Sequence, residues 1–351
     1  MKCITYFLII LSGLGLVSAR FSHAASLNER TIEQTIPSRV FETPEKTIVT
    51  LVIENDSLGG GTDNNYTSGV RFNFMNVNAT FPPLAHKIDK LIPTFEINNT
   101  SSIHYSFGQN LYTPRDITQS QVSNNDRPWA AFLYGSLGMV TLTDNHTDEV
   151  EATFGVVGPA ALGKPAQHFI HKHLTNSPIP KGWSHQLKNE PGIILAWQRG
   201  WPMFVNGRIK NNFWSLKPYA GAAIGNIRTH GDVGFTIRLS PNDSKWQDTP
   251  IRVAPAMPGT GIYEIPQNKW SWSLFAGFEA RAVVRDIFLD GNSFANSHSV
   301  NKKPIVSDIT SGIATTYRNT RISYTVVYRT KEFYLQDRPE VFGALSLGIR
   351  F

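Results

Sequence analysis

Apolar and polar residues alternate with period two along much of this chain, most clearly in its last eleven residues, VFGALSLGIRF. Side chains alternate between the two faces of a strand, so Val341, Leu345, Leu347, Ile349 and Phe351 share one face. A last strand that ends on an aromatic residue is typical of a bacterial outer-membrane barrel, although a buried edge strand of a soluble sandwich can end in the same way. The alternation suits a barrel wall, which presents apolar residues to lipid and tolerates polar ones toward the lumen.

The same alternation runs through 270–282 and 321–329. In the first of these segments, one face begins with Trp270, and the other carries Glu279 and Arg281. A carboxylate and a guanidinium need water or an ionic partner, and inside a membrane only a lumen offers either. The two segments therefore favour the barrel over the sandwich.

About twelve strand-like segments separated by turn residues follow this pattern. An even number of strands returns both ends of a barrel to the periplasm. The pattern therefore predicts an all-β fold, a 12-stranded antiparallel transmembrane β-barrel over 47–351. The predicted strands lie near 47–56, 67–77, 101–110, 130–142, 150–158, 190–203, 212–225, 232–239, 268–285, 306–318, 321–332 and 341–351.

The N-terminal segment has the composition of an export signal. Lys2 is followed by a short apolar run, 7–19, and then by small residues at 22–25. This order predicts a secretory signal peptide over 1–25. An uncleaved membrane anchor is the alternative, but the run is shorter than the roughly 20 residues that a helix needs to span a bilayer. The polar segment 26–46 is predicted to be a periplasmic lead-in.

Composition agrees with an exported barrel. Cys3 is the only cysteine, so the mature chain would have neither disulfides nor thiolate chemistry. Cleavage after residue 25 removes Lys2 and Arg20 and no acidic residue, so the net charge falls from +6 to +4. This modest excess suits a phosphate-rich lipid surface, whereas no nucleic-acid-binding motif occurs.

One connection, 159–189, lacks the alternation. Within it, 160–174 has helical character after Pro165, and His168 and His171 are spaced i, i+3. The sequence therefore predicts a short helix in an extracellular loop. Inserts of this kind tend to carry function.

Three polar clusters, within 54–69, 108–128 and 158–190, fall at the turns after the first, third and fifth predicted strands. If the first strand runs outward from the periplasm, all three turns are extracellular. Connectivity alone then brings the clusters to one rim of the barrel.

These clusters offer two kinds of chemistry. Asn55 and Asp56 supply oxygen ligands for a hard cation such as Ca²⁺, and His171 can act as a general base toward water. Simpler interpretations remain open, because Asn, Asp and Gly runs often only form turns and a histidine on a loop helix is often only a surface residue. The glycines at 59–61 are not a phosphate-binding loop, since no Lys-Ser/Thr follows them.

Three ordered segments, END(x)5TDNNYTSG, GQNLYTP…DRPWAAFLYG and GVVGPAALG…QHFIH…GW…QLKNEPG, resemble the lipid A 3-O-deacylase family (LpxR type) of Gram-negative outer membranes. The resemblance is strong over 47–200. Outside this range the chain matches the family only in its barrel pattern. It implies a twelve-stranded barrel with a site between the outer wall and a loop helix. In that site a histidine activates water and Ca²⁺ polarises the acyl carbonyl.

The family's site residues transfer to this chain by position. Its Asn-Asp pair falls on Asn55 and Asp56, its Tyr-Thr hydroxyl on Thr67 and its base on His171. The resemblance therefore implies that Asp56 and Asn55 hold Ca²⁺, that His171 takes a proton from water, and that Thr67 orients water or substrate.

Two features of the family are missing here. The lysine that follows the Tyr-x-Pro motif is absent, so Arg115 is expected to replace it as a phosphate contact, together with Arg127. The acid shortly after the histidine is also absent, and Glu190 is the expected stand-in among the metal ligands.

The predicted function is Ca²⁺-dependent hydrolysis of an ester-linked (3-O) acyl or acyloxyacyl chain of lipid A by water that a histidine activates. The expected partners are lipid A or lipopolysaccharide as substrate, outer-membrane lipids and the barrel-assembly machinery, and no nucleic acid. The expected location is the Gram-negative outer membrane, with the site toward the extracellular leaflet. Two alternatives remain: a porin or adhesin without enzymatic activity, and a serine-type outer-membrane phospholipase, for which no Gly-x-Ser-x-Gly elbow is found.

Overall fold

The computed structural model describes residues 38–41, 43–59, 65–81, 83, 86, 95–143, 145–175, 178–242 and 246–351. The signal peptide predicted over 1–25 and most of the lead-in predicted over 26–46 lie outside these residues. The strands are β1 (Thr47–Asn55), β2 (Asn65–Asn76), β3 (Ser102–Thr113), β4 (Ala130–Thr143), β5 (His146–Val157), β6 (Glu190–Gly200), β7 (Val205–Ile209), β8 (Asn212–Gly225), β9 (Arg228–Pro241), β10 (Trp270–Asp286), β11 (Ile305–Tyr317), β12 (Thr320–Arg329) and β13 (Glu340–Arg350). The helical elements are α3 (Ser38–Phe41), η1 (Asp56–Leu58), η2 (Pro159–Ala161), α5 (Gly163–Ile170), η3 (His171–Thr175), η4 (Gly182–His185) and α6 (Ile287–Asp290).

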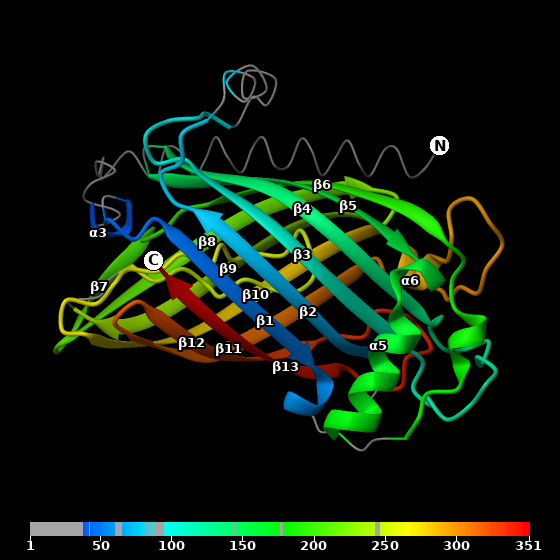
Figure 1. Cartoon of the computed structure of the whole chain (residues 1–351). Coiled ribbons are helices and arrows are strands. Elements are labelled where there is room, and N and C mark those ends of the chain that lie inside the picture. The colour runs from blue at the N-terminus through cyan, green and yellow to red at the C-terminus, as the bar shows by residue number, and fades with distance from the viewer. Residues whose placement is uncertain are drawn as a thin grey trace.

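Twelve of the described strands form a closed antiparallel barrel (Figure 1). The sheet closes because β1 pairs with β13 and β6 pairs with both β5 and β8. This confirms the predicted fold and strand number. In the described part of the chain, no helix is long and apolar enough to cross a membrane.

The short strand β7 is an addition that the sequence pattern did not predict. The strand expected over 190–203 ends at Gly200, and the chain rejoins the sheet as β7, which pairs with β8. Pro202 has no N–H to donate to the ladder, and Met203 has a positive φ of 57°. Together these two residues interrupt the strand after Gly200, so that it is divided into β6 and β7.

The predicted alternation holds along the wall. In β10, Leu274 and Phe278 are exposed, whereas Glu279 and Arg281 are buried. Arg281 donates to Asp308 of β11 at 3.0 Å. The outward face is therefore apolar, and the charged side chains meet ionic partners inside the barrel.

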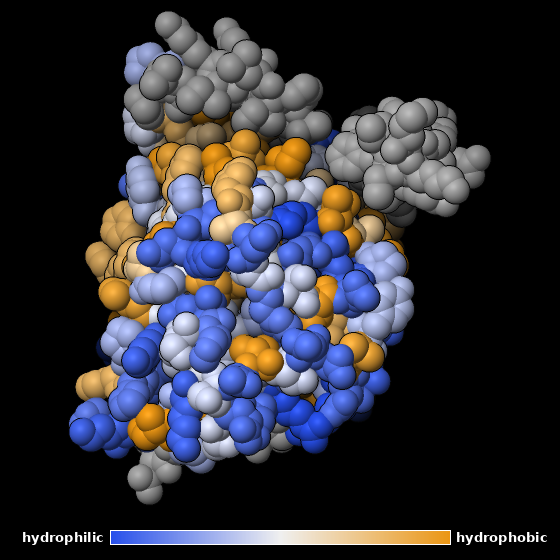
Figure 2. Space-filling model, turned by 90° about the vertical axis from the view of Figure 1, so that its right-hand side faces the viewer, coloured by the Kyte–Doolittle hydropathy of each residue, from blue (hydrophilic) through white to orange (hydrophobic). Residues whose placement is uncertain are grey.

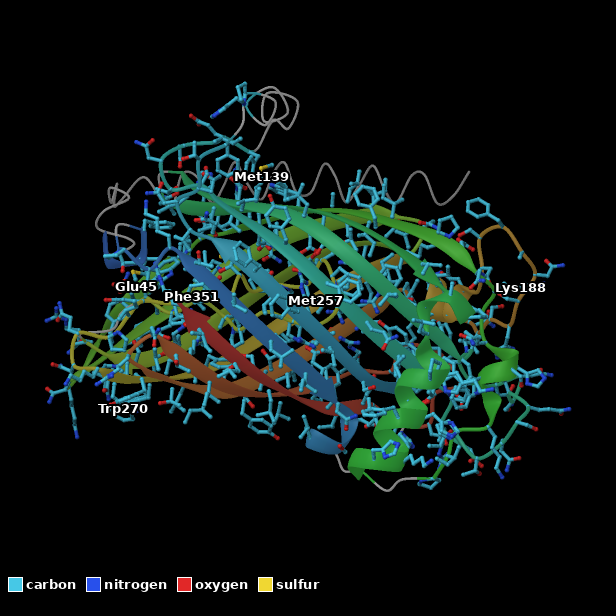
Figure 3. All side chains as sticks on the ribbon, in the orientation of Figure 1. Glu45, Met139, Lys188, Met257, Trp270 and Phe351 are labelled. Carbon is cyan, nitrogen blue, oxygen red and sulfur yellow. The ribbon has the colours of Figure 1, made fainter. Side chains whose placement is uncertain are left out.

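Both ends of the described wall meet at one end of the barrel. Thr47 and Phe351 exchange two backbone hydrogen bonds, 2.9 and 2.8 Å long. Figure 3 labels Glu45 and Phe351 at this end and Lys188 at the opposite end. The connections after β1, β3 and β5 lie at that opposite end, as the predicted topology required.

The connection between β9 and β10 fills the lumen. Its segment 246–267, here called the plug, contributes buried side chains such as Trp246, Val253 and Tyr263, and Figure 3 labels Met257 among the strands. Arg252 Nε donates to Glu54 Oε1 of β1 at 2.6 Å. The plug is thus anchored to the barrel wall from within, a feature that the alternation pattern did not predict.

Candidate active site

The end of the barrel opposite the termini carries the predicted polar clusters. Figure 2 looks onto this end: hydrophilic residues cover most of it, and hydrophobic residues gather mainly toward its edges. The connections β1–β2, β3–β4 and β5–β6 all lie here. A polar end surface beside an apolar wall suits the boundary between water and lipid.

The first part of the site is the end of β1. Asn55 has an extended backbone, and its side chain accepts a hydrogen bond from the Ser57 backbone N at 2.8 Å, which caps η1. The first residue of η1 is Asp56, whose side chain is 1% exposed. The cap therefore fixes a buried carboxylate directly after the strand.

Thr67 lies in β2 beside this corner. Asn55 pairs with Ser68, the next residue after Thr67. The pairing of β2 with β3 shifts between Tyr66 and Ser68, so Thr67 is the extra residue of a β-bulge. Its side chain lies outside the described part of the structure. The backbone alone brings Asn55, Asp56 and Thr67 together.

The second part of the site is the loop helix α5, which docks on β3 and β4. Trp183 Nε1 donates to Gln167 Oε1 at 2.7 Å, and Gln109 Nε2 of β3 donates to the Ala161 carbonyl at 2.6 Å. A Cβ on Gly163 would stand 2.5 Å from the Ala131 Cβ, so only glycine allows this close approach. The predicted short helix in this loop is confirmed.

His171 follows α5 directly and begins a single π-helical turn. Its side chain is 4% exposed, and its Nδ1 lies 2.7 Å from the Pro178 carbonyl oxygen. A carbonyl can only accept a hydrogen bond, so Nδ1 carries the proton and the neutral ring keeps its lone pair on Nε2. His168, one turn earlier, is exposed.

A row of paired residues connects the two parts of the site. Asn55 pairs with Ser68, Ser68 with Leu111, and Leu111 with Ala131, on which α5 docks. Neighbouring strands are about 4.8 Å apart, so Asn55 and Ala131 are separated by roughly 14 Å of wall. The helix that ends at His171 therefore stands on the strands next to the Asn55–Asp56 corner.

The two candidate phosphate-binding arginines differ in environment. Arg115 is exposed and forms an ion pair with Asp337. Arg127 is fully buried, with its Nη1 3.1 Å from Glu332 Oε2 and its guanidinium 5.2 Å from the Tyr112 ring centre. An anion in solution can reach Arg115, whereas Arg127 ties the β3–β4 connection to the β12–β13 connection.

Glu190, the candidate third metal ligand, is not brought to the Asn55–Asp56 corner. It lies at the start of β6, five strands from β1, which is nearly across the barrel. Its carboxylate accepts hydrogen bonds from Asn226 Nδ2, Asn292 Nδ2 and the Ser293 backbone N, 2.8–3.1 Å long. It joins three loops at the rim.

The Asn55–Asp56 corner offers oxygen donors of the kind that Ca²⁺ prefers. Its side chains offer one carboxylate and one carboxamide oxygen, and no sulfur or nitrogen ligand is supplied by these two residues. Hard oxygens of this kind suit Ca²⁺ rather than a soft metal. The Asn55 oxygen already accepts from Ser57, so Asp56 is the principal candidate ligand.

A family model described as "Outer membrane protein LpxR" matches residues 9–351. The chain belongs to the LpxR family. The resemblance found in the sequence is thereby confirmed, and the family is one of the outer membrane. The fold agrees: LpxR from Salmonella typhimurium superimposes with a TM-score of 0.70 at 18% identity, over 87% of this chain and 100% of that one.

Other outer-membrane barrels are far less similar to this LpxR family member. The β domain of the Bordetella autotransporter BrkA gives a TM-score of 0.36 at 8% identity, over 87% of this chain and 97% of that one. The translocator domain of NalP from Neisseria meningitidis gives 0.35 at 11% identity, over 97% of each chain. No curated protein sequence matches the chain.

Proposed function

We propose that this protein is an ester hydrolase that removes a 3-O-linked acyl or acyloxyacyl chain from lipid A at the extracellular leaflet. The observation that carries the proposal is the contact between His171 Nδ1 and the Pro178 carbonyl. It orients a buried imidazole so that Nε2 is the nitrogen able to take a proton. Membership of the LpxR family supports lipid A as the substrate class.

The reaction requires one water molecule per ester. His171 Nε2 takes a proton from water as the water oxygen bonds to the ester carbonyl carbon. The bond between this carbon and the sugar oxygen then breaks, and the proton passes from His171 to the leaving oxygen. The products are a carboxylic acid and a free sugar hydroxyl. The family resemblance gives the Thr67 hydroxyl the task of orienting water or substrate.

Asp56, with Asn55, is the candidate ligand set for Ca²⁺. Bound there, Ca²⁺ would supply Lewis-acid stabilisation of negative charge on the carbonyl oxygen. The cap that Asn55 forms on η1 holds the Asp56 carboxylate in one position. Asn55 therefore has a positioning role whether or not its own oxygen reaches the metal.

Substrate binding uses the surface around the helix. Leu162, Phe169 and Ile179 are exposed apolar side chains on the β5–β6 connection, where acyl chains of the outer leaflet would be in contact with them. Arg115 is exposed at the neighbouring connection and can exchange Asp337 for a glucosamine phosphate. Arg127 would support that connection through its ion pair with Glu332.

The plug argues against the porin alternative. It occupies the lumen and is anchored by Arg252 to Glu54 and by a hydrogen bond from the Tyr134 hydroxyl to the Val253 carbonyl. A porin requires a water-filled channel. We expect the purified protein to give no ion conductance in a planar bilayer, and sustained conductance would favour the porin.

The direct test uses purified protein in detergent with lipid A. We expect release of fatty acid by the wild type, loss of release in His171→Gln, and full activity after treatment with a serine-reactive phosphonate. Inactivation by the phosphonate would instead favour the serine-type phospholipase. No release by a folded wild-type barrel with Ca²⁺ present would contradict the proposal.

A further inference from the structure

A second cluster of ionisable side chains lies inside the barrel, away from the candidate active site. His104 of β3 is 1% exposed, and its ring crosses over Gly138 of β4. A Cβ on Gly138 would lie 2.1 Å from His104 Nε2, so the glycine opens the path that the ring takes. The imidazole thereby reaches β5, two strands away from its own.

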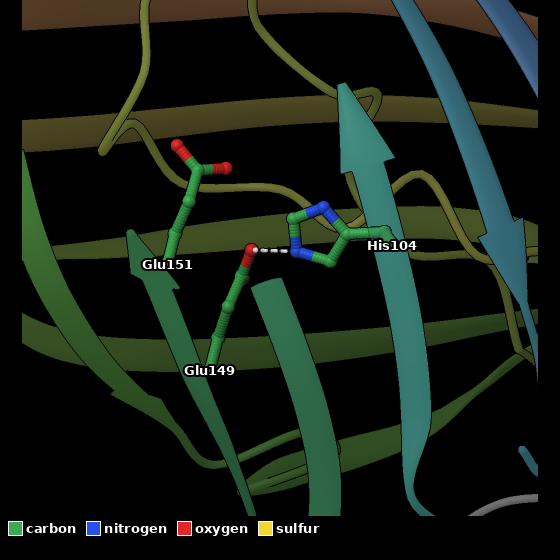
Figure 4. Close-up of side chains that lie close together, drawn as sticks. All are labelled: His104, Glu149 and Glu151. Atoms are coloured by element: carbon green, nitrogen blue, oxygen red, sulfur yellow. Dashed lines mark ion pairs between the residues drawn. The ribbon is translucent and has the colours of Figure 1, made fainter. Parts of the chain in front are cut away.

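Two carboxylates of β5 meet this ring (Figure 4). Glu149 and Glu151 are two residues apart in one strand, and each offers an oxygen within 4.8 Å of the other oxygen and of a His104 ring nitrogen. The distance from His104 Nε2 to Glu149 Oε1 is 3.5 Å. Three potential metal ligands from two strands therefore converge.

The imidazole is buried without a hydrogen bond. Neither His104 Nδ1 nor Nε2 has a hydrogen-bond partner in the described structure. Leaving buried polar atoms in this state is unfavourable, because they have lost their hydrogen bonds to water without gaining others. A ring nitrogen directed at two carboxylates needs either a proton or a metal ion between them.

We propose that His104, Glu149 and Glu151 bind a divalent transition-metal ion, with Zn²⁺ the expected occupant. Imidazole nitrogen and carboxylate oxygen are both ligands of Zn²⁺, which takes a fourth ligand from water where the protein supplies three. Ca²⁺ is disfavoured, because it takes six to eight oxygen ligands and this cluster offers only two carboxylates and a nitrogen.

Beside its two carboxylates the cluster has room for a water ligand. A cavity of about 20 Å³, enough for one water molecule, is lined by Glu149 and Glu151 and by Ala256 and Met257 of the plug, but not by His104. Asp232 also lines this cavity. The positive charge of Arg71 disfavours a bound cation, because its Nη2 lies 2.6 Å from Glu151 Oε2. Without Asp232, the two carboxylates of Glu149 and Glu151 against this one guanidinium leave the cluster net negative by one charge.

Glu151 can keep its present partners while binding metal. Its Oε2 accepts from Arg71, and its Oε1 accepts from Thr153 Oγ1 at 3.0 Å. Each carboxylate oxygen has two lone pairs, so either one can take a further partner. The arginine and the threonine would orient the carboxylate toward the ion, as second-layer groups do in metal sites.

The proposed metal site is independent of the candidate active site. His104 pairs with Met75, and Met75 with Ile48, which lies seven residues before Asn55 along β1. At about 3.3 Å per residue, roughly 23 Å of strand separates the two. A metal here would link β3 to β5 next to the plug. It would lie toward the end of the barrel where the termini meet.

Equilibrium dialysis of the folded, metal-stripped protein against Zn²⁺ tests the proposal. We expect the wild type to bind one equivalent more than His104→Gln and Glu149→Gln, with at least a ~100-fold loss of affinity at that site in each variant. An excess of Ca²⁺ should not displace this equivalent. Glu149→Gln changes a partly exposed side chain and so keeps the test valid if His104→Gln fails to fold.

His146→Gln is the matched control. His146 Nε2 also lies near a β5 carboxylate, 3.2 Å from Asp148 Oδ2, but Asp148 is already bound through both oxygens by Arg199. This variant should keep the extra equivalent. Equal Zn²⁺ binding by the wild type, His104→Gln and Glu149→Gln would overturn the proposal and leave the cluster as a simple ion pair. Loss of the extra Zn²⁺ equivalent in His146→Gln would also overturn the proposal. Lipid A is not used, so neither outcome depends on the proposed activity.

Discussion

His171 Nδ1 and the Pro178 carbonyl oxygen lie 2.7 Å apart, which locks the end of the loop helix to a proline seven residues later. The contact decides which ring nitrogen carries the proton. The same contact distinguishes His171, which is buried, from His168, which is exposed one turn earlier. Only one of the two histidines therefore has the burial and orientation of a general base.

Replacing His171 should abolish catalysis without unfolding the barrel. We expect His171→Gln and His171→Ala to lower the rate of ester hydrolysis at least ~10²-fold, the scale of losing a general base. Measurement of kcat for fatty-acid release checks this loss.

His168→Gln is the control, since it changes an exposed histidine three residues earlier. It should retain activity within a few-fold of the wild type. An inactive His168→Gln together with an active His171→Gln would mean that the base lies one turn earlier on the helix.

Asp56→Asn should abolish activity, because it removes the one negative charge at the Asn55–Asp56 corner while preserving side-chain shape. EDTA should inactivate the wild type, and added Ca²⁺ should restore it. Asp116→Asn is a suitable control. Asp116 is an exposed loop residue whose carboxylate accepts a hydrogen bond from the Thr118 backbone N. Full activity in the presence of chelator would remove the metal from the mechanism.

Glu54→Ala should destabilise the barrel by about 3–5 kcal/mol, because it leaves the charge of Arg252 buried without its partner. The temperature at which the folded band disappears on a heat-modifiability gel measures this loss. Glu96→Ala, at an exposed residue outside the strands, should leave that temperature unchanged. Equal temperatures for Glu54→Ala and the wild type would show that the plug does not depend on this ion pair.

The loops at the rim should loosen in acid. Burial alone would raise the pKa of Glu332, but Arg127 and Arg329 outweigh it and hold this pKa below its usual range. Because its pKa is lowered in the folded state, the Glu332 carboxylate stabilises the fold fully above about pH 4.3, the pKa of an ordinary glutamate. This stabilisation is lost as the pH falls further.

The unfolding temperature of the wild type should therefore approach that of Glu332→Gln as the pH is lowered from 6 to 3. Hydrogen exchange in the β3–β4 connection should rise over the same interval. A constant difference between the two proteins at every pH would show that Glu332 does not stabilise the rim through its charge.

The barrel could be predicted from the sequence because its signal is local. Residues such as Leu274 and Glu279 reveal their faces through period-two alternation, and each strand repeats that signal. The plug gives no such signal, because its burial depends on partners far away in the sequence. Arg252 and Glu54, for example, are 198 residues apart.

The candidate site divides in the same way. Asn55, Asp56 and His171 were predicted from motifs, and strand order accounts for their common rim. Pro178 could not be predicted as the partner of His171, since a backbone carbonyl has no sequence signature. The convergence of His104 with Glu149 depends on strand register and on the open space above Gly138, which no motif encodes.

The proposed activity is tested most directly by mass spectrometry of lipid A from Gram-negative cells that express the wild type, His171→Gln or no protein. We expect the wild type alone to convert lipid A to a form that lacks the mass of one 3-O-linked acyl or acyloxyacyl chain. Both proteins should be present as folded barrels in the outer membrane. Identical lipid A in all three strains, or equal conversion by His171→Gln, would contradict hydrolysis by histidine-activated water.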